Sequence, residues 1–161
     1  MQTIEALRQL LAYNQWANRA TIQSLKNHPS SDTKAFDALI HILIAEREWF
    51  LRLTENKDTT GFNFWPDLSF ADAEALASEM QIEYTRLINS LTEEDLERVA
   101  IYKNSRGVEY RTKYRDILMH VFNHSTYHRG QVAMAIRAGG REPANTDYII
   151  YQRETERAGD V

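Results

Sequence analysis

The sequence of 161 residues has no cysteine, and this absence excludes disulfides, thiolate metal ligands and a cysteine nucleophile. No apolar run approaches the roughly 18 residues that cross a bilayer, and the first residues lack the basic start and apolar segment of a signal peptide. Basic residues are not in excess. The sequence has 19 Lys and Arg and 23 Asp and Glu, so the net charge is −4. A broad nucleic-acid-binding surface is therefore not expected. We therefore expect a cytoplasmic protein that binds neither nucleic acid nor membrane.

The sequence does contain long amphipathic helices. Apolar residues recur every three or four positions in four stretches, which are residues 3–26, 34–54, 70–91 and 113–138. Four helices of similar length favour an all-α four-helix bundle, and the chain has the size of one ordinary domain. We expect that single domain to span residues 1–155, with residues 156–161 as a polar tail.

Two connections between the helices are informative. Residues 55–68 are long enough for a crossover between the second and third helices, where a tight turn would force antiparallel neighbours. The aromatic residues of this connection, at 62–65, are candidates for a lid or an interface. Residues 98–111 place β-forming residues on both sides of Lys103-Asn-Ser-Arg-Gly107, which predicts a small β-hairpin before the last long helix.

Helix ends can also be predicted from single residues. Ser69 and Asp72 match the capping box that opens a helix, and Thr112 is placed to cap the last long helix. After Gly139 and Gly140 end that helix, residues 147–151 favour one more short element.

Four histidines carry the clearest chemical pattern. His120, His124 and His128 occupy every fourth position of the last long helix. Each step of four residues leaves a net drift of about 40°, so the three rings lie along one side of the helix. That side is the apolar one, with His124 and His128 near its centre and His120 near its edge. His41 lies on the inward stripe of the second helix, with a small alanine one turn away on either side.

These rings can be interpreted in two ways. A single buried histidine is most often a core residue with an ordinary hydrogen-bond partner. For a cluster, each unpaired imidazole costs about 1–3 kcal/mol, and one metal ion satisfies several rings together. Three ring nitrogens from two facing helices, with a free position beside them, match the catalytic zinc arrangement. The cluster therefore favours a metal site.

Spacing alone does not choose between the pairs His120/His124 and His124/His128. Their positions on the apolar stripe favour the second pair. Neither pair belongs to the His-Glu-x-x-His motif of zinc metalloproteases, because Val121 and Ser125 stand where that motif has its glutamate. Peptidase activity of that type is not expected.

Several polar residues are candidates to orient the metal ligands or to bind substrate, since metal-bound histidines usually donate their other N–H to a neighbouring acceptor. They are Glu48, Gln131, His120, Asn14 and Asn18. Glu48 could instead form an ion pair with the residue four positions later, Arg52. The two asparagines could instead fix the register of the bundle.

Four segments together resemble the DinB/YfiT-like superfamily of metal-dependent proteins, over about residues 5–152. They are Tyr13-Asn-Gln-Trp-Ala-Asn18, Leu39-Ile-His-Ile-Leu-Ile-Ala-Glu46 with Trp49, His120-Val-Phe-Asn-His-Ser-Thr-Tyr-His-Arg-Gly-Gln131, and Gly139 to Tyr148. The resemblance implies a four-helix bundle with a long crossover. It also implies one divalent metal ion held by His41, His124 and His128, with His120 matching a histidine that is not usually a ligand.

Imidazole ligands leave the metal open between zinc, nickel, iron and manganese. An open metal position suits a metal-dependent hydrolase that acts on a small-molecule substrate. The resemblance also implies a homodimer and a thiol-dependent S-transferase that uses a low-molecular-weight thiol. The alternative is a non-catalytic stress-response or metal-binding dimer. A fourth protein ligand, His120 or Glu48, would close the site and favour a structural ion. The description of early members as DNA-damage-inducible concerns their expression and not their chemistry.

Overall fold

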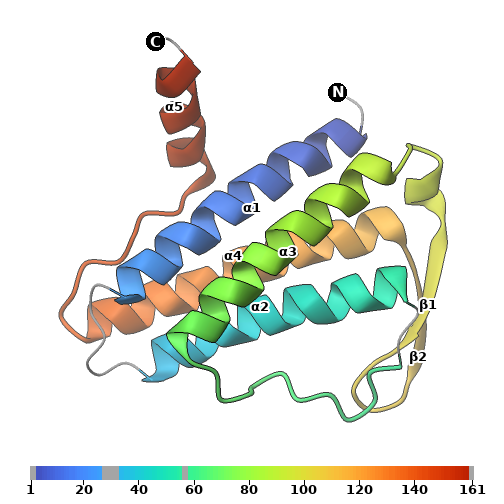
Figure 1. The fold of residues 1–161 in the computed structure, drawn as a ribbon, viewed down its shortest axis with the longest axis horizontal. Coiled ribbons are helices and arrows are strands. Elements are labelled where there is room, and N and C mark those ends of the chain that lie inside the picture. Colours follow the sequence, from blue (N-terminus) through green and yellow to red (C-terminus); the bar gives the residue numbers. More distant parts are fainter. Residues whose placement is uncertain (1–2, 27–32, 56–57, 160–161) are drawn as a thin grey trace.

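The computed structural model describes residues 3–26, 33–55 and 58–159. It contains the four predicted helices as α1 (Thr3–Lys26), α2 (Thr33–Thr54), α3 (Phe70–Ser90) and α4 (Tyr114–Ala138). They form a four-helix bundle in which α2 and α3 run in the same direction, while α1 and α4 run in the other (Figure 1). The connection between α2 and α3 therefore returns along the bundle. The predicted bundle and its long crossover are confirmed.

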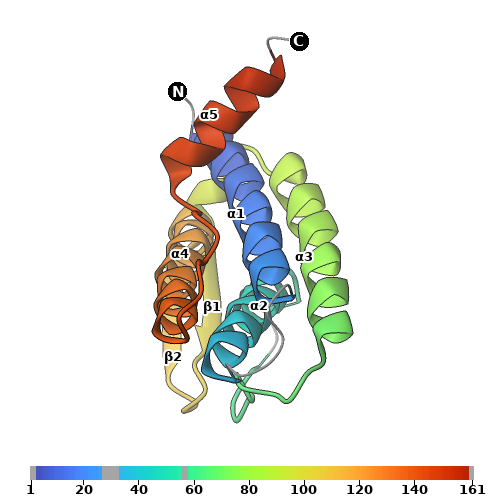
Figure 2. The ribbon, with the colours of Figure 1, turned by 90° about the vertical axis from the view of Figure 1, so that its left-hand side faces the viewer.

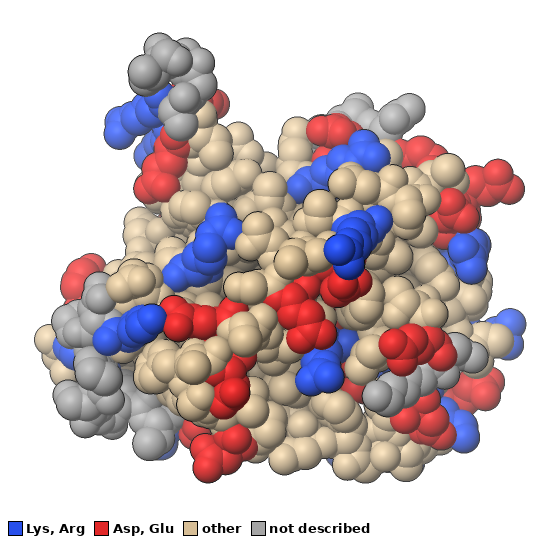
Figure 3. All heavy atoms as spheres, viewed as in Figure 1, with Lys and Arg blue, Asp and Glu red and all other residues tan. Residues whose placement is uncertain are grey.

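The bundle core is built from the apolar stripes predicted by the periodicity. Each helix contributes fully buried aliphatic residues, among them Leu7, Leu43, Ile88 and Ile117. Charged residues of both signs are mixed on the outer face formed by α1 and α3 (Figure 3). None of the described helices combines the length and hydropathy that a bilayer-spanning helix needs.

The structure shows the residues at the starts of α3 and α4, where two helix caps were predicted. The capping box of α3 is present, because the Ser69 hydroxyl accepts from the Asp72 amide and the Asp72 carboxylate accepts from the Ser69 amide. The predicted cap of α4 at Thr112 is wrong. Lys113 is the N-cap residue and makes no side-chain cap, and the Thr112 hydroxyl lies 3.2 Å from the Tyr102 hydroxyl instead. Thr112 is paired within a β-strand, which turns its side chain away from the helix start.

That strand belongs to the predicted hairpin, which is confirmed. A short helical turn, η1 (Asp95–Glu97), leads into β1 (Val99–Lys103), which pairs antiparallel with β2 (Glu109–Lys113). The turn between the strands includes Gly107 at φ +78°, a left-handed conformation that glycine adopts without strain. The hairpin covers the end of the bundle where α2 ends and α4 begins (Figure 1).

The crossover is tied to both the bundle and the hairpin. Arg52 near the end of α2 donates to the Thr59 hydroxyl at 2.8 Å, and the Thr59 hydroxyl lies 3.3 Å from the Lys103 carbonyl oxygen. Phe62 and Phe64 pack against the core from the outside. These contacts hold the middle of the crossover against α2.

The last predicted short element is a helix, α5 (Tyr148–Gly159), which continues past residue 155, where the polar tail was expected to begin. It extends away from the bundle beyond α1 (Figure 2). Tyr148 and Tyr151 pack around Tyr13, and the Trp16 indole N–H donates to Glu154 at 3.1 Å. This aromatic contact attaches α5 to α1.

Candidate metal centre

Three histidines converge where α2 lies beside α4. His41 comes from α2, and His124 and His128 come from successive turns of α4. One ring nitrogen of each lies within 4.8 Å of the corresponding atoms of the other two, and all three side chains are half-buried. The spacing of four residues brings two rings to one face of α4, and helix packing brings the third. The described residues therefore contain three imidazoles that could hold a metal ion.

Hydrogen bonds orient two of the rings. His41 Nδ1 lies 3.3 Å from the backbone carbonyl oxygen of Phe64, in the crossover. His128 Nδ1 lies 2.8 Å from Gln131 Oε1, one turn further along α4. A carbonyl oxygen only accepts, so these contacts place the proton on Nδ1 and leave the Nε2 lone pair for a ligand. Gln131 therefore lies where the sequence predicted an orienting residue.

Burial favours the neutral form of His41 and His124. Burial, together with the neighbouring His128 and His41 rings, lowers the pKa of His124 to about 3. Burial also lowers the pKa of His41, against the opposing effect of the Phe64 carbonyl. Neutral imidazole is the form that binds metal ions. His41 and His124 thus offer neutral donor atoms near neutral pH.

The crossover forms one wall of the cluster. The Trp65 indole stacks on the His41 ring with 4.3 Å between centroids and 8° between planes, although Trp65 is 56% exposed. Trp65 and Gln131 also border an open apolar hollow of about 510 Å³ between α2 and α4. The predicted aromatic segment thus lies over His41, and the hollow lies beside Trp65 and Gln131.

His120 occupies a different environment from the three converging histidines. Its side chain is exposed, and its ring packs edge-on against Trp49 with 5.1 Å between centroids. The ring centroid lies 5.5 Å from that of His124, but no ring nitrogen of His120 belongs to the converging group. Its position at the edge of the stripe matches the helical geometry expected from the sequence.

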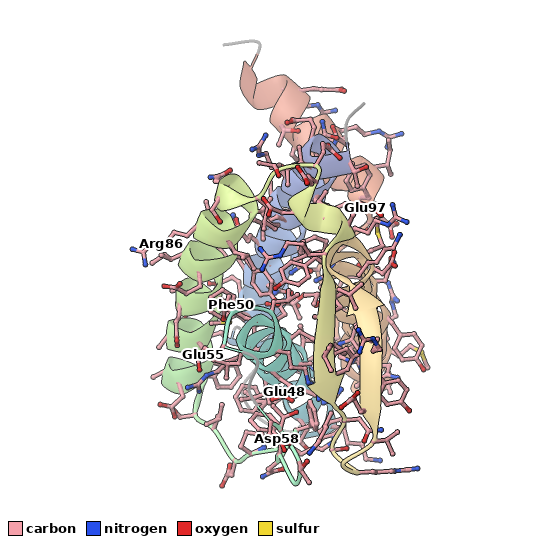
Figure 4. All side chains as sticks on the ribbon, turned by 90° about the vertical axis from the view of Figure 1, so that its right-hand side faces the viewer. Glu48, Phe50, Glu55, Asp58, Arg86 and Glu97 are labelled. Carbon is pink, nitrogen blue, oxygen red and sulfur yellow. The ribbon has the colours of Figure 1, made fainter. Side chains whose placement is uncertain are left out.

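Glu48 lies in a buried ion pair. Its Oε1 atom is 2.8 Å from Arg52 Nη2, and both side chains are almost completely buried. Figure 4 shows Glu48 on the side of α2 that faces the hairpin, with Phe50 on the side toward α3. The Arg52 guanidinium also lies over the Trp49 ring at 4.4 Å. Of the two roles weighed for Glu48, the structure shows the ion pair.

Asn14 and Asn18 belong to a buried polar cluster that sequence reasoning did not identify. Their side-chain amides donate to Glu46 Oε1 at 2.8 and 2.9 Å, and the Ser125 hydroxyl donates to the same oxygen at 2.8 Å. Arg129 Nη1 donates to both asparagine oxygens, at 2.7 and 2.8 Å. The cluster joins α1, α2 and α4. The sequence signal that could have indicated this cluster is a pair of polar residues four positions apart on an otherwise apolar face, which occurs in α1 (Asn14 and Asn18) and again in α4 (Ser125 and Arg129).

A four-helix bundle with a crossover and three converging histidines defines a class of helical proteins with a candidate metal centre. The sequence profile of the DinB family matches residues 1–159. The chain belongs to the DinB family. It is 26% identical over 165 residues to Protein DinB of Bacillus subtilis (strain 168), covering 92% of this chain and 96% of that protein. It also shares its fold with a crystal structure of a DinB-like protein from Bacillus cereus, with a TM-score of 0.62, 19% identity, and coverage of 90% of this chain and 99% of that chain.

Proposed function

We propose that His41, His124 and His128 bind one divalent metal ion, and that this centre catalyses a reaction of a small molecule. The observation that carries the proposal is the convergence of three imidazoles, which no other His, Asp or Glu joins among the described residues. Three protein ligands with an open position are typical of catalytic centres, whereas four are typical of structural ones. Zinc, nickel, iron and manganese are the candidates, and imidazole ligands do not separate them.

Two reactions suit such a centre. A bound ion would lower the pKa of a water molecule towards 7 for hydrolysis, or would hold a thiolate for transfer to an electrophile. The chain has no cysteine, so a thiol would have to come from a low-molecular-weight cosubstrate. In both cases the Phe64 carbonyl and Gln131 orient two ligands, and Trp65 bounds the space that a substrate would enter.

The metal content of purified variants tests the ligand set. Wild-type protein is expected to carry close to one divalent ion per chain, and His124→Ala and His128→Ala are expected to lose it. His120→Ala is the matched control, because it removes an imidazole from the same helix one turn away and should keep the ion. Full occupancy in His128→Ala would refute the ligand set. Loss in His120→Ala with retention in His128→Ala would move the site one turn towards the start of α4.

A second measurement separates catalysis from metal storage. Cobalt(II)-substituted protein reports its coordination number through its visible spectrum, and an open position should accept added azide or a small thiol with a spectral change. A spectrum of four protein ligands that no added ligand alters would contradict the catalytic proposal and favour the non-catalytic alternative. Turnover of model esters, or of a thiol with an alkylating substrate, should then depend on His128.

A further inference from the structure

A second cavity lies on another side of the bundle, between α1 and α3. It has a volume of about 260 Å³ and shares no residue with the histidine centre. Its lining is mixed. Leu11, Ile22, Ala77, Met80, Val121 and Phe122 supply the apolar part, and polar side chains that include Arg19, Glu46 and Glu74 supply the rest. An engineered apolar cavity of about 150 Å³ is large enough for benzene, so this space suits a molecule of one ring with a short substituent.

Among the polar groups that line this cavity, the most deeply buried acidic one is the carboxylate of Glu46. Glu46 lines the cavity although only 4% of the residue is exposed. The hydrogen bonds from Asn14, Asn18 and Ser125 all go to Oε1. Among the described residues none donates to Oε2. One oxygen of a buried carboxylate is thus satisfied by protein donors, and the other is left for a donor from outside the chain.

The cation of the polar cluster, Arg129, makes no direct hydrogen bond to the Glu46 carboxylate among the described contacts. Arg129 donates to the oxygens of Asn14 and Asn18, whose amides in turn donate to Glu46 Oε1. The hydroxyl of Tyr84, which also lines the cavity, donates to the backbone oxygen of Glu46 and not to its carboxylate. An ionised carboxylate only accepts hydrogen bonds, and its bonds to charged donors are about twice as strong as neutral ones. A cationic N–H donor is therefore the best match for Oε2.

We propose that this cavity is a binding site for a small amine with an apolar ring or chain. The ammonium group donates to Glu46 Oε2, and the apolar part fills the space against Leu11, Met80 and Phe122. The mouth is bridged by polar contacts between α1 and α3, in which Gln15 donates to the Gln81 carbonyl at 3.1 Å and Arg19 donates to Gln81 Oε1 at 3.0 Å. These exposed side chains rotate without disturbing the core, so they allow entry.

Benzylamine is the probe, and benzyl alcohol and benzoate have the same ring with a neutral or an anionic group. Titration of the wild-type protein, followed by amide chemical shifts, should show benzylamine binding at least tenfold more tightly than benzoate, with shifts centred on α1 and α3. Benzoate binding as tightly as benzylamine would overturn the proposal. His128→Ala should bind benzylamine equally well. Loss of binding in that variant would place the amine on a metal ion and would also overturn the proposal.

A matched pair of alanine substitutions on α3 tests the location. Ala77 lines the cavity, whereas Ala75 is exposed two residues away. Ala77→Leu should weaken benzylamine binding at least tenfold, and Ala75→Leu should leave it unchanged. Equal affinities in these two variants would refute the site. Glu46→Gln should weaken benzylamine binding about tenfold and affect benzyl alcohol little, in line with the strength of charge-assisted hydrogen bonds.

Discussion

Arg129 offers a demanding test of how the buried polar cluster holds the bundle together. The residue is 2% exposed, and its guanidinium donates to Asn14 and Asn18 on α1 and to Thr126 on its own helix. The asparagines pass this interaction to the carboxylate of Glu46 on α2. Arg129→Met keeps much of the side-chain volume and removes the charge together with three hydrogen bonds.

The expected cost follows from what the substitution leaves behind. Two buried amide oxygens lose their donor, and the Glu46 carboxylate loses the cation that balances it. Breaking a buried charge network by removing one partner costs about 3–5 kcal/mol. For a chain of this size each kcal/mol lowers the melting temperature by about 2–4 °C, so Arg129→Met should lower it by about 6–20 °C. The loss of about 3–5 kcal/mol is a large part of the typical free energy of unfolding of about 5–15 kcal/mol.

Thermal and urea unfolding followed by circular dichroism measure this difference. The protein should be treated with a chelator first, because a bound ion adds its own stabilisation. Arg86→Met is the matched control. The Arg86 side chain is 72% exposed, pairs with Glu83 on its own helix, and points away from the bundle (Figure 4), so its loss should cost less than about 1 kcal/mol.

The result that refutes this reasoning is equal stability of the two variants. A second check comes from the double variant Glu46→Gln with Arg129→Met. Because the carboxylate no longer needs a balancing cation, the double variant should lose less stability than the sum of the two single losses. Additive losses would show that Arg129 and Glu46 are not coupled through the asparagines.

Two further predictions concern the histidine centre. Gln131→Leu should weaken metal affinity by about 10–100-fold in a chelator competition, because His128 loses the acceptor that orients it, while Met134→Leu on the next turn should have little effect. Metal-free protein should lose stability as the pH falls from about 6.5 towards 3, because in this window the unfolded chain protonates a histidine that the folded chain keeps neutral at position 124. The melting temperature of His124→Ala should fall less over the same range, and an equal fall would contradict the assignment.

Much of the fold was predictable because its determinants are local. Helical periodicity placed all four long helices, β-forming residues around a glycine-containing turn placed the hairpin, and Ser69 with Asp72 placed the start of α3. The cap predicted at Thr112 failed because strand pairing, a contact with residues ten or more positions away, takes that residue first. A residue suited to cap a helix does not do so when pairing with a distant strand fixes its backbone and side chain elsewhere.

In the candidate site, too, the features set by local sequence were predictable and those set by packing between distant segments were not. Helical geometry was enough to bring His124 and His128 to one face, and the spacing of Glu48 and Arg52 already indicated their ion pair as an alternative. The acceptor of His41 is the backbone carbonyl of Phe64, and no side-chain pattern predicts a backbone atom in a loop. The cluster around Glu46 depends on how α1, α2 and α4 are rotated against one another, which a single sequence does not specify.

The crossover has a consequence for how proteins with this architecture diverge. The three histidines of the candidate metal centre lie on two helices, whereas Phe64 and Trp65, which contact His41, lie in a loop. A backbone carbonyl survives any substitution at its own position, so the orientation of His41 tolerates sequence change there. The exposed indole does not contribute to the buried core and can be exchanged freely. In the proposed centre, the residues that hold the ion and the residues that would select a substrate are therefore separate, so substitutions in a short loop can change substrate preference without altering the bundle.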